Sequence, residues 1–204
     1  MKKIMFKDKY GLTTAVLEGR KTMTRRVITS RLQSIYLSDE EIPWKIREAS
    51  TIKDLSSYKI GEDVALAQPY KNIIAAITPT YGSPHAYDHL RSESGWNNKM
   101  FVRTDLMPHR IRITGIKVER MQDISEEDAM REGIFHYEKP PLYHECDRFA
   151  PWPPYVKPYK HDHDNLKYRA TARYAFAYLI DKVSGIGTWK KNPWVFVYEF
   201  ELLR

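Results

Sequence analysis

Two segments of this chain carry patterns that are typical of β-strands. Residues 109–120 alternate isoleucine or valine with charged or hydroxylated residues, and residues 194–200 are rich in β-branched and aromatic side chains. Successive side chains of a strand point to opposite faces, so alternation predicts a half-buried strand. β-Branched and aromatic residues pack well on a pleated surface. The chain is therefore expected to contain a β-sheet.

Helical patterns lie between the predicted strands. A first helix is predicted for residues 10–18, because Gly19 stands where a C-cap glycine belongs. A short helix is predicted between Ser125, which can cap it, and Gly133. The longest helix is predicted for residues 165–183.

Further segments complete the expected domain. Short strands are predicted at residues 4–6, 64–67 and 99–103. Residues 71–98 have the proline and glycine content of a loop, and residues 136–164 contain six prolines, which also predicts a loop. The element order fits one α+β domain over residues 1–204, with insertions at about 29–57, 71–98 and 136–187.

Charge and cysteine content limit the partners and the compartment. The formal charge is +7 and the pI is near 9.3, so a polyanion is a reasonable partner, and a basic surface without a nucleic-acid role is an equal alternative. Cys146 stands alone, which fits a reducing compartment. No stretch has the length of a membrane span or the pattern of a signal peptide. We expect a cytoplasmic monomer.

The segment 19–26 carries the strongest chemical signal. It reads Gly-Arg-Lys-Thr-Met-Thr-Arg-Arg, with four cations and two hydroxyls directly after the first predicted helix. Arginine forks and lysine point charges bind phosphate or carboxylate, so an anion-binding loop is predicted. A desolvated Lys21 has a lowered pKa and could act as a base toward Thr24. A solvated basic turn without function is the alternative.

The pattern Gly19-x-Lys21-x-x-Thr24-x-Arg26 resembles the signature of the ASCH domain family, a branch of the PUA-like superfamily. The order of the surrounding elements is also similar to that family, over about half of the chain. The resemblance implies a PUA-like β-barrel with flanking helices and long insertions. It also implies a cleft that faces the signature segment and binds RNA or a modified nucleoside.

The resemblance implies a specific chemistry as well. One branch of the family hydrolyses the acetyl amide of N4-acetylcytidine with a lysine, a threonine and a glutamate. Lys21 and Thr24 match the first two, and Glu132 is the candidate for the third. In this reaction Lys21 activates an oxygen nucleophile, and Glu132 orients Lys21 or protonates the leaving amine. The expected ligand-binding residues are Arg20, Thr22, Arg25, Arg26, Trp96 and Lys99.

Other clusters are weaker. His161 and His163, with His144 and Cys146, could offer zinc a mixed ligand set, but their spacing matches no standard module. Aromatic residues between 143 and 159 could stack on bases or anchor a loop. No glycine-rich phosphate loop is present. We therefore expect no metal and no cofactor.

Three hypotheses follow. The first is a module that binds RNA or a modified nucleoside through the basic cleft. The second is an amidohydrolase that acts on an acylated nucleoside through Lys21, Thr24 and Glu132. The third is an accessory protein of a phage or mobile element that binds a protein partner through its loops.

Overall fold

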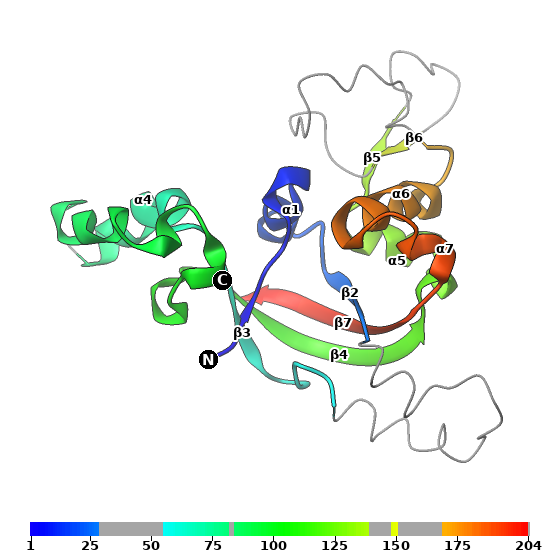
Figure 1. Cartoon of the computed structure of the whole chain (residues 1–204), viewed down its shortest axis with the longest axis horizontal. Helices are drawn as coiled ribbons and strands as arrows, with labels where there is room; N and C mark the ends of the chain where they lie inside the picture. The colour runs from blue at the N-terminus through cyan, green and yellow to red at the C-terminus, as the bar shows by residue number, and fades with distance from the viewer. Residues whose placement is uncertain (29–54, 82–83, 139–147, 151–168, 204) are drawn as a thin grey trace.

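The computed structural model describes residues 1–28, 55–81, 84–138, 148–150 and 169–203. Its centre is one five-stranded sheet (Figure 1). The strand order is β1 (Lys3–Ile4), β3 (Asp63–Leu66), β4 (Arg110–Arg120), β7 (Trp194–Leu203) and β2 (Met23–Val27). β1 runs parallel to β3, and the other neighbours are antiparallel.

The two strands with the clearest sequence patterns form the backbone of this sheet. β4 and β7 pair from Arg110 opposite Leu203 to Arg120 opposite Trp194, with one register shift near Gly115. Figure 1 shows them as a long curved pair, and α1, α5 and α6 lie on one side of it. The prediction of strands at 109–120 and 194–200 is confirmed.

The remaining elements are α-helices, short 3-10 turns and one small two-stranded sheet. The α-helices are α1 (Leu12–Leu17), α4 (Tyr70–Tyr81), α5 (Glu126–Arg131), α6 (Ala172–Ser184) and α7 (Thr188–Lys191). The 3-10 turns are η1 (Asp8–Tyr10), η3 (Pro84–Arg91), η4 (Ser94–Trp96), η5 (Lys99–Phe101), η6 (Thr104–Leu106) and η7 (Met121–Asp123). β5 (Phe135–Tyr137) pairs with β6 (Arg148–Ala150).

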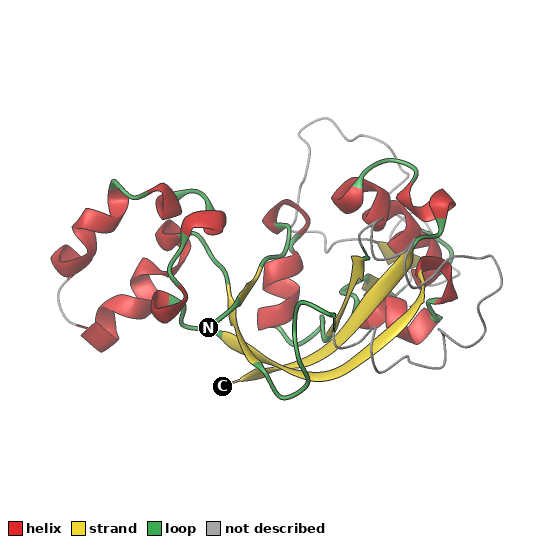
Figure 2. Cartoon of the chain, turned by 60° about the horizontal axis from the view of Figure 1, so that its bottom comes forward, coloured by secondary structure: helices red, strands yellow, loops and turns green. Residues whose placement is uncertain are grey.

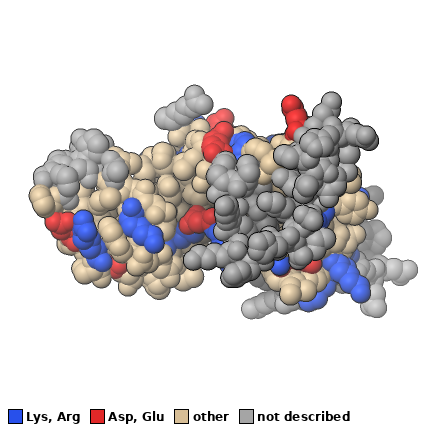
Figure 3. All heavy atoms as spheres, turned by 90° about the horizontal axis from the view of Figure 1, so that it is seen from above, with Lys and Arg blue, Asp and Glu red and all other residues tan. Residues whose placement is uncertain are grey.

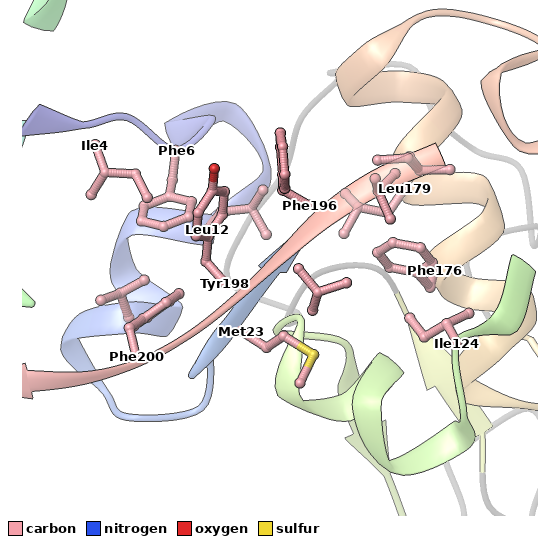
Figure 4. Close-up of a cluster of buried hydrophobic side chains, with 14 of the residues drawn as sticks. Ile4, Phe6, Leu12, Met23, Ile124, Phe176, Leu179, Phe196, Tyr198 and Phe200 are labelled. Carbon is pink, nitrogen blue, oxygen red and sulfur yellow. The ribbon is translucent and has the colours of Figure 1, made fainter. Parts of the chain in front are cut away.

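The main hydrophobic core lies between the sheet and the helices on that side. Figure 4 shows Phe6 and Leu12, from the N-terminal segment, on one side of β2 and β7, and Phe176 and Leu179 of α6 on the other. All four side chains are buried. The N-terminal segment and α6 thus share one core with β2, the strand that carries part of the cationic segment.

A second core belongs to a helical lobe formed by residues 70–81 and 84–107. Figure 2 shows this lobe as a group of helices beside the sheet. Tyr70, Ile73 and Ile77 lie one helical turn apart on α4 and are buried against Val102 and Met107. The loop prediction for 71–98 is therefore wrong in its described part. The prolines and glycines suggested a loop, but the apolar residues at helical spacing form a helix that buries one face.

Two other local predictions need correction. The strand expected at 99–103 is the turn η5, and Met100 and Phe101 are exposed there instead of alternating in and out of a sheet. Of the helix expected over 165–183, residues 165–168 lie outside the described residues. Residues 169–171 are not helical, and α6 begins at Ala172, because Thr171 caps it by accepting a hydrogen bond from the Tyr174 amide. Its predicted end at residue 183 is confirmed to within one residue, because α6 ends at Ser184 and Gly185 caps it.

The α+β class is confirmed, whereas a closed barrel is not seen. Within the described ranges, β1 and β2 are the two edges of the sheet, and no ladder joins them. No helix in those ranges is long and apolar enough to cross a membrane.

Candidate functional site

The cationic segment forms a strand, not the loop that its composition suggested. Met23–Val27 pair with β7 along their whole length, from Met23 opposite Glu199 to Val27 opposite Val195. Lys21, just before this strand, forms an isolated antiparallel bridge with Glu132. Pairing with β7 therefore determines the extended conformation of Thr24 and Arg25. The bridge to Glu132 holds the backbone of Lys21 in place.

Helix α5 delivers the partner of Lys21. Ser125 caps its first turn by accepting a hydrogen bond from the Asp128 amide, and Glu132 is its last capping residue. Gly133 then leaves the helix with a φ of +97°, a conformation that suits glycine. The Thr22 amide donates to the Arg131 carbonyl oxygen at 2.9 Å, which holds the helix end against the cationic segment.

Lys21 and Glu132 form a buried ion pair. The Lys21 Nζ donates to Glu132 Oε2 at 2.7 Å, to the Glu132 carbonyl oxygen at 2.7 Å and to the Met23 carbonyl oxygen at 2.8 Å. The two residues are each 3% exposed. All three ammonium protons therefore have acceptors. These contacts favour a charged Lys21 ammonium and a charged Glu132 carboxylate in the absence of ligand.

Arg25 holds the other side of the same carboxylate. Its side chain is fully buried and donates to Glu132 Oε1 at 3.2 Å, to Glu119 Oε1 at 2.5 Å and to Asp128 Oδ2 at 3.2 Å. Lys117 also donates to Asp128, at 3.0 Å. This network fixes the position of Glu132, so Arg25 is primarily a structural residue.

Burial and charge act in opposite directions on these cations. Burial lowers the pKa of Lys21 below its ordinary value, although Glu132 opposes this effect. Burial also acts to lower the pKa of Arg25, but Glu132, with help from Glu119, outweighs it and raises that pKa. Lys21 is thus the buried cation that can lose a proton, and Arg25 stays charged.

A cavity of about 710 Å³ opens beside this pair. Its lining includes Lys21, Thr24 and Glu132, and its apolar wall includes Phe6 and Phe176. Thr24 is 4% exposed, yet its hydroxyl has no hydrogen-bond partner among the described residues. The described part of the site therefore presents the Thr24 hydroxyl, without a partner there, next to a buried lysine–glutamate pair. Lys21, Thr24 and Glu132 come together as expected, and their catalytic roles stay predictions.

The expected ligand-binding residues separate into two groups. Arg25, Arg26 and Lys99 line the cavity. Arg20, which donates to Glu18 at 2.8 Å, and Thr22 are not part of the lining. Sequence proximity had grouped them, but both side chains contact other parts of the fold. Arg20 lies over the Phe135 ring, and the Thr22 hydroxyl accepts a hydrogen bond from Arg131.

Trp96 and Lys99 also differ from expectation. Trp96 packs against the second core and lies outside the cavity lining. The Lys99 ammonium, although it lines the cavity, donates to Asp8 Oδ1 at 2.8 Å and to the Phe6 carbonyl oxygen. Lys99 therefore ties the helical lobe to the N-terminal segment.

Several residues of the cavity had no clear signal in the sequence. Lys7 and Lys191 are exposed lining residues, and Phe6 and Phe176 form part of the wall. Phe176 belongs to a helical stripe that predicts core packing, and nothing in that pattern marks it as lining a site. Only the tertiary fold brings these four residues to one hollow.

The four residues that could offer zinc a mixed ligand set all lie outside the described residues. His144, Cys146, His161 and His163 fall in the ranges that the structure leaves out, as do the aromatic residues between 143 and 159. Across the described ranges, no group of three or more histidine, cysteine, aspartate or glutamate side chains could hold a metal ion.

The described residues on the face seen in Figure 3 do not form one continuous basic patch. Figure 3 shows acidic and basic side chains interspersed over the side that it views. Fold and site together define a mixed α+β protein with a buried lysine–glutamate pair beside a cavity. Comparison with protein-family models, with curated proteins and with solved structures gives no match.

Proposed function

We propose that the cavity binds a modified nucleoside, either free or as part of RNA. The observation that carries this proposal is the unpartnered Thr24 hydroxyl beside the buried Lys21–Glu132 pair. The volume of about 710 Å³ falls within the roughly 300–1,000 Å³ that is usual for small-molecule sites. Phe6 and Phe176 supply an apolar wall suited to a base.

The proposal includes a PUA-like barrel of the ASCH type. Its support is the curvature of the sheet, which brings the two edge regions within contact distance. Arg26, on edge strand β2, donates to the Met5 carbonyl oxygen at 2.7 Å, just after edge strand β1. The Arg26 guanidinium also lies 5.5 Å from the centre of the Phe6 ring. The Arg26 side chain thus connects β2 to the segment after β1, although the two strands are not paired. The cavity lies beside this contact.

Calorimetric titration with N4-acetylcytidine and with cytidine tests the binding proposal. We expect the acetylated nucleoside to bind more tightly, because its carbonyl oxygen can accept a hydrogen bond from the Thr24 hydroxyl. Thr24→Val keeps the shape of the side chain and removes only that donor. It should reduce the preference for the acetylated nucleoside by about tenfold, as for one lost hydrogen bond.

Equal binding of the two nucleosides, or a preference that Thr24→Val leaves unchanged, would contradict this assignment. Arg20→Gln is the matched control, because Arg20 belongs to the same cationic segment but does not line the cavity. It should leave both affinities unchanged.

The Lys21–Glu132 pair favours a second candidate, hydrolysis of the acetyl amide. A proton passes from the Lys21 Nζ to Glu132 along the 2.7 Å bond, and burial of Lys21 promotes this transfer. The Lys21 amine then takes the Thr24 hydroxyl proton, and the Thr24 oxygen bonds to the acetyl carbon. The bond from carbon to N4 breaks, and N4 takes the proton from Lys21. Water then hydrolyses the threonine ester, which releases acetate and restores the hydroxyl.

Acetate release from N4-acetylcytidine tests this reaction. Lys21→Met should reduce the rate by at least about a hundredfold, as is usual when a general base is lost. Circular dichroism should verify that the variant is folded, and Arg20→Gln should keep the wild-type rate. Absence of turnover by the wild type would refute catalysis. If RNA affinity then falls steeply with salt, the chain acts as a binding module.

A further inference from the structure

Three cations of the cavity lining that are not buried have no acidic partner among the described residues. We call Lys7, Arg26 and Lys191 the rim cations. Among the described residues, the Lys7 and Lys191 ammonium groups form no hydrogen bond or ion pair. Arg26 donates only from Nη2, to the Met5 carbonyl oxygen, and its Nε and Nη1 have no acceptor within the described part of the chain. These groups have donors available for a ligand.

The other cations of the lining are already neutralised. Lys21 pairs with Glu132, Arg25 pairs with Glu119 and Asp128, and Lys99 pairs with Asp8. The positive charge of the cavity is therefore concentrated at the rim. A hollow with low-dielectric walls and charge of one sign attracts an oppositely charged ligand. A neutral nucleoside would leave this charge unused.

We propose that the ligand carries a phosphate group and that Lys7, Arg26 and Lys191 bind it. The substrate class is then a modified nucleotide, free or within RNA, with its base near Thr24 and its phosphate at the rim. This inference rests on the proposed function. Arginine binds phosphate oxygens in a fork, and lysine contributes a compact charge, so the set suits a phosphate dianion or diester.

A second hollow extends the site beyond Arg26. This hollow of about 280 Å³ shares Met5, Arg26 and Val27 with the main cavity. Tyr58 and Tyr198 also line it, with their ring centres 5.1 Å apart in an edge-to-face contact. Arg26 thus stands between two neighbouring hollows. A phosphate between two linked nucleotides would occupy this position, which favours a nucleotide within RNA.

Four ligands, compared two by two, measure the effect of the phosphate and the effect of the acetyl group on affinity independently. They are cytidine, cytidine 5′-monophosphate and the N4-acetylated form of each, titrated by calorimetry at fixed salt. We expect the phosphate to tighten binding by about tenfold for either base, as for two or three charge-assisted hydrogen bonds. A trinucleotide with central N4-acetylcytidine is the fifth probe, and it should bind still more tightly if the second hollow is used.

Single variants assign the phosphate effect to the rim. Lys7→Ala, Arg26→Gln and Lys191→Ala should each reduce the preference for the monophosphate over the nucleoside by about two- to tenfold. Lys190→Ala is the matched control, because Lys190 is an exposed neighbour on α7 that does not line the cavity. It should leave the preference unchanged.

The outcomes distinguish this inference from the proposed function. If acetylation tightens binding but phosphate does not, the inference is overturned and the proposed function stands. If phosphate tightens binding through the rim cations but acetylation has no effect, the inference stands and the assigned modification is overturned. If no probe binds, both are overturned. A phosphate effect that Lys190→Ala reduces as much as Lys191→Ala would show nonspecific attraction and would also overturn the inference.

Discussion

Lys21 and Glu132 depend on each other energetically, because both are buried. Lys21→Met would leave the Glu132 carboxylate with Arg25 as its remaining cation, at 3.2 Å. Breaking a buried pair in this way costs about 3–5 kcal/mol. We expect Lys21→Met to lower the free energy of unfolding by that amount, measured by urea denaturation.

The double variant Lys21→Met/Glu132→Gln completes this test. It removes both charges, while Arg25 keeps Glu119 and Asp128 as partners. The double variant should therefore be less destabilised than the sum of the two single variants, by at least about 1 kcal/mol. Strict additivity would mean that the two side chains do not interact in solution.

Asp128 gives the network a defined pH dependence. Burial acts to raise its pKa, but the hydrogen bonds from Lys117 and Arg25 outweigh this and hold the pKa below the ordinary 3.8. The carboxylate thus stabilises the folded chain above pH 3.8, and that stabilisation is lost as the pH falls through the lower folded-state pKa.

Comparison of the wild type with Asp128→Asn measures this contribution. At pH 7 the variant should be less stable by about 1–2 kcal/mol, which is usual for charged hydrogen bonds. Below pH 3.8 the difference between the two proteins should shrink. Urea denaturation over a pH series checks the result, and a difference that grows on acidification would refute the assignment.

At this scale the sequence indicated the lysine, threonine and glutamate because their types and spacing matched a signature. Lys7 and Lys191 could not be identified, because each is an ordinary surface lysine in the sequence. Their assignment to one cavity requires the positions of η1 and α7, which depend on packing between segments far apart in the chain.

Among the elements, the end of α5 controls the position of Lys21. A Cβ on Gly133 would lie 3.3 Å from the Lys21 Cβ, and the φ of +97° would be strained for any other residue. Gly19 has a similar φ of +74°, but a Cβ there would meet no atom within 4 Å. The two glycines thus share backbone strain and differ in the contact with Lys21.

Alanine substitution of Gly133 and of Gly19 tests whether the end of α5 sets the position of Lys21. Each alanine variant should be destabilised by about 1 kcal/mol through backbone strain. Gly133→Ala should also weaken binding of N4-acetylcytidine, because it displaces Lys21, whereas Gly19→Ala should not. Calorimetry on the two folded variants measures the difference. Equal affinities would show that α5 does not set the geometry of the site.

The predictability of the elements follows from their patterns. β4 was predictable because its buried isoleucines alternate with polar residues, and β7 because it is a continuous run of β-branched and aromatic residues. Helix α4 was not, because Pro79 and the glycines and prolines that follow suggest a loop. β2 was missed because its central residues Thr24, Arg25 and Arg26 are all polar, and only pairing with β7 makes them a strand.

At the scale of the whole molecule, the cavity lies where three parts of the chain meet. The N-terminal segment supplies Phe6, the end of α6 supplies Val183, and the helical lobe supplies Met100. Lys99 holds the lobe to the N-terminal segment through Asp8. No single segment of sequence contains the site, so its shape could not be derived from local patterns.

Methionine methyl NMR provides the most direct test that this cavity is the ligand site. The chain has seven methionines; Met5 and Met100 line the cavity, whereas Met107 and Met121 are buried in the two cores away from it. On titration with N4-acetylcytidine, we expect the Met5 and Met100 signals to shift while those of Met107 and Met121 stay in place. The reverse pattern, or no shift at saturating ligand, would contradict the account.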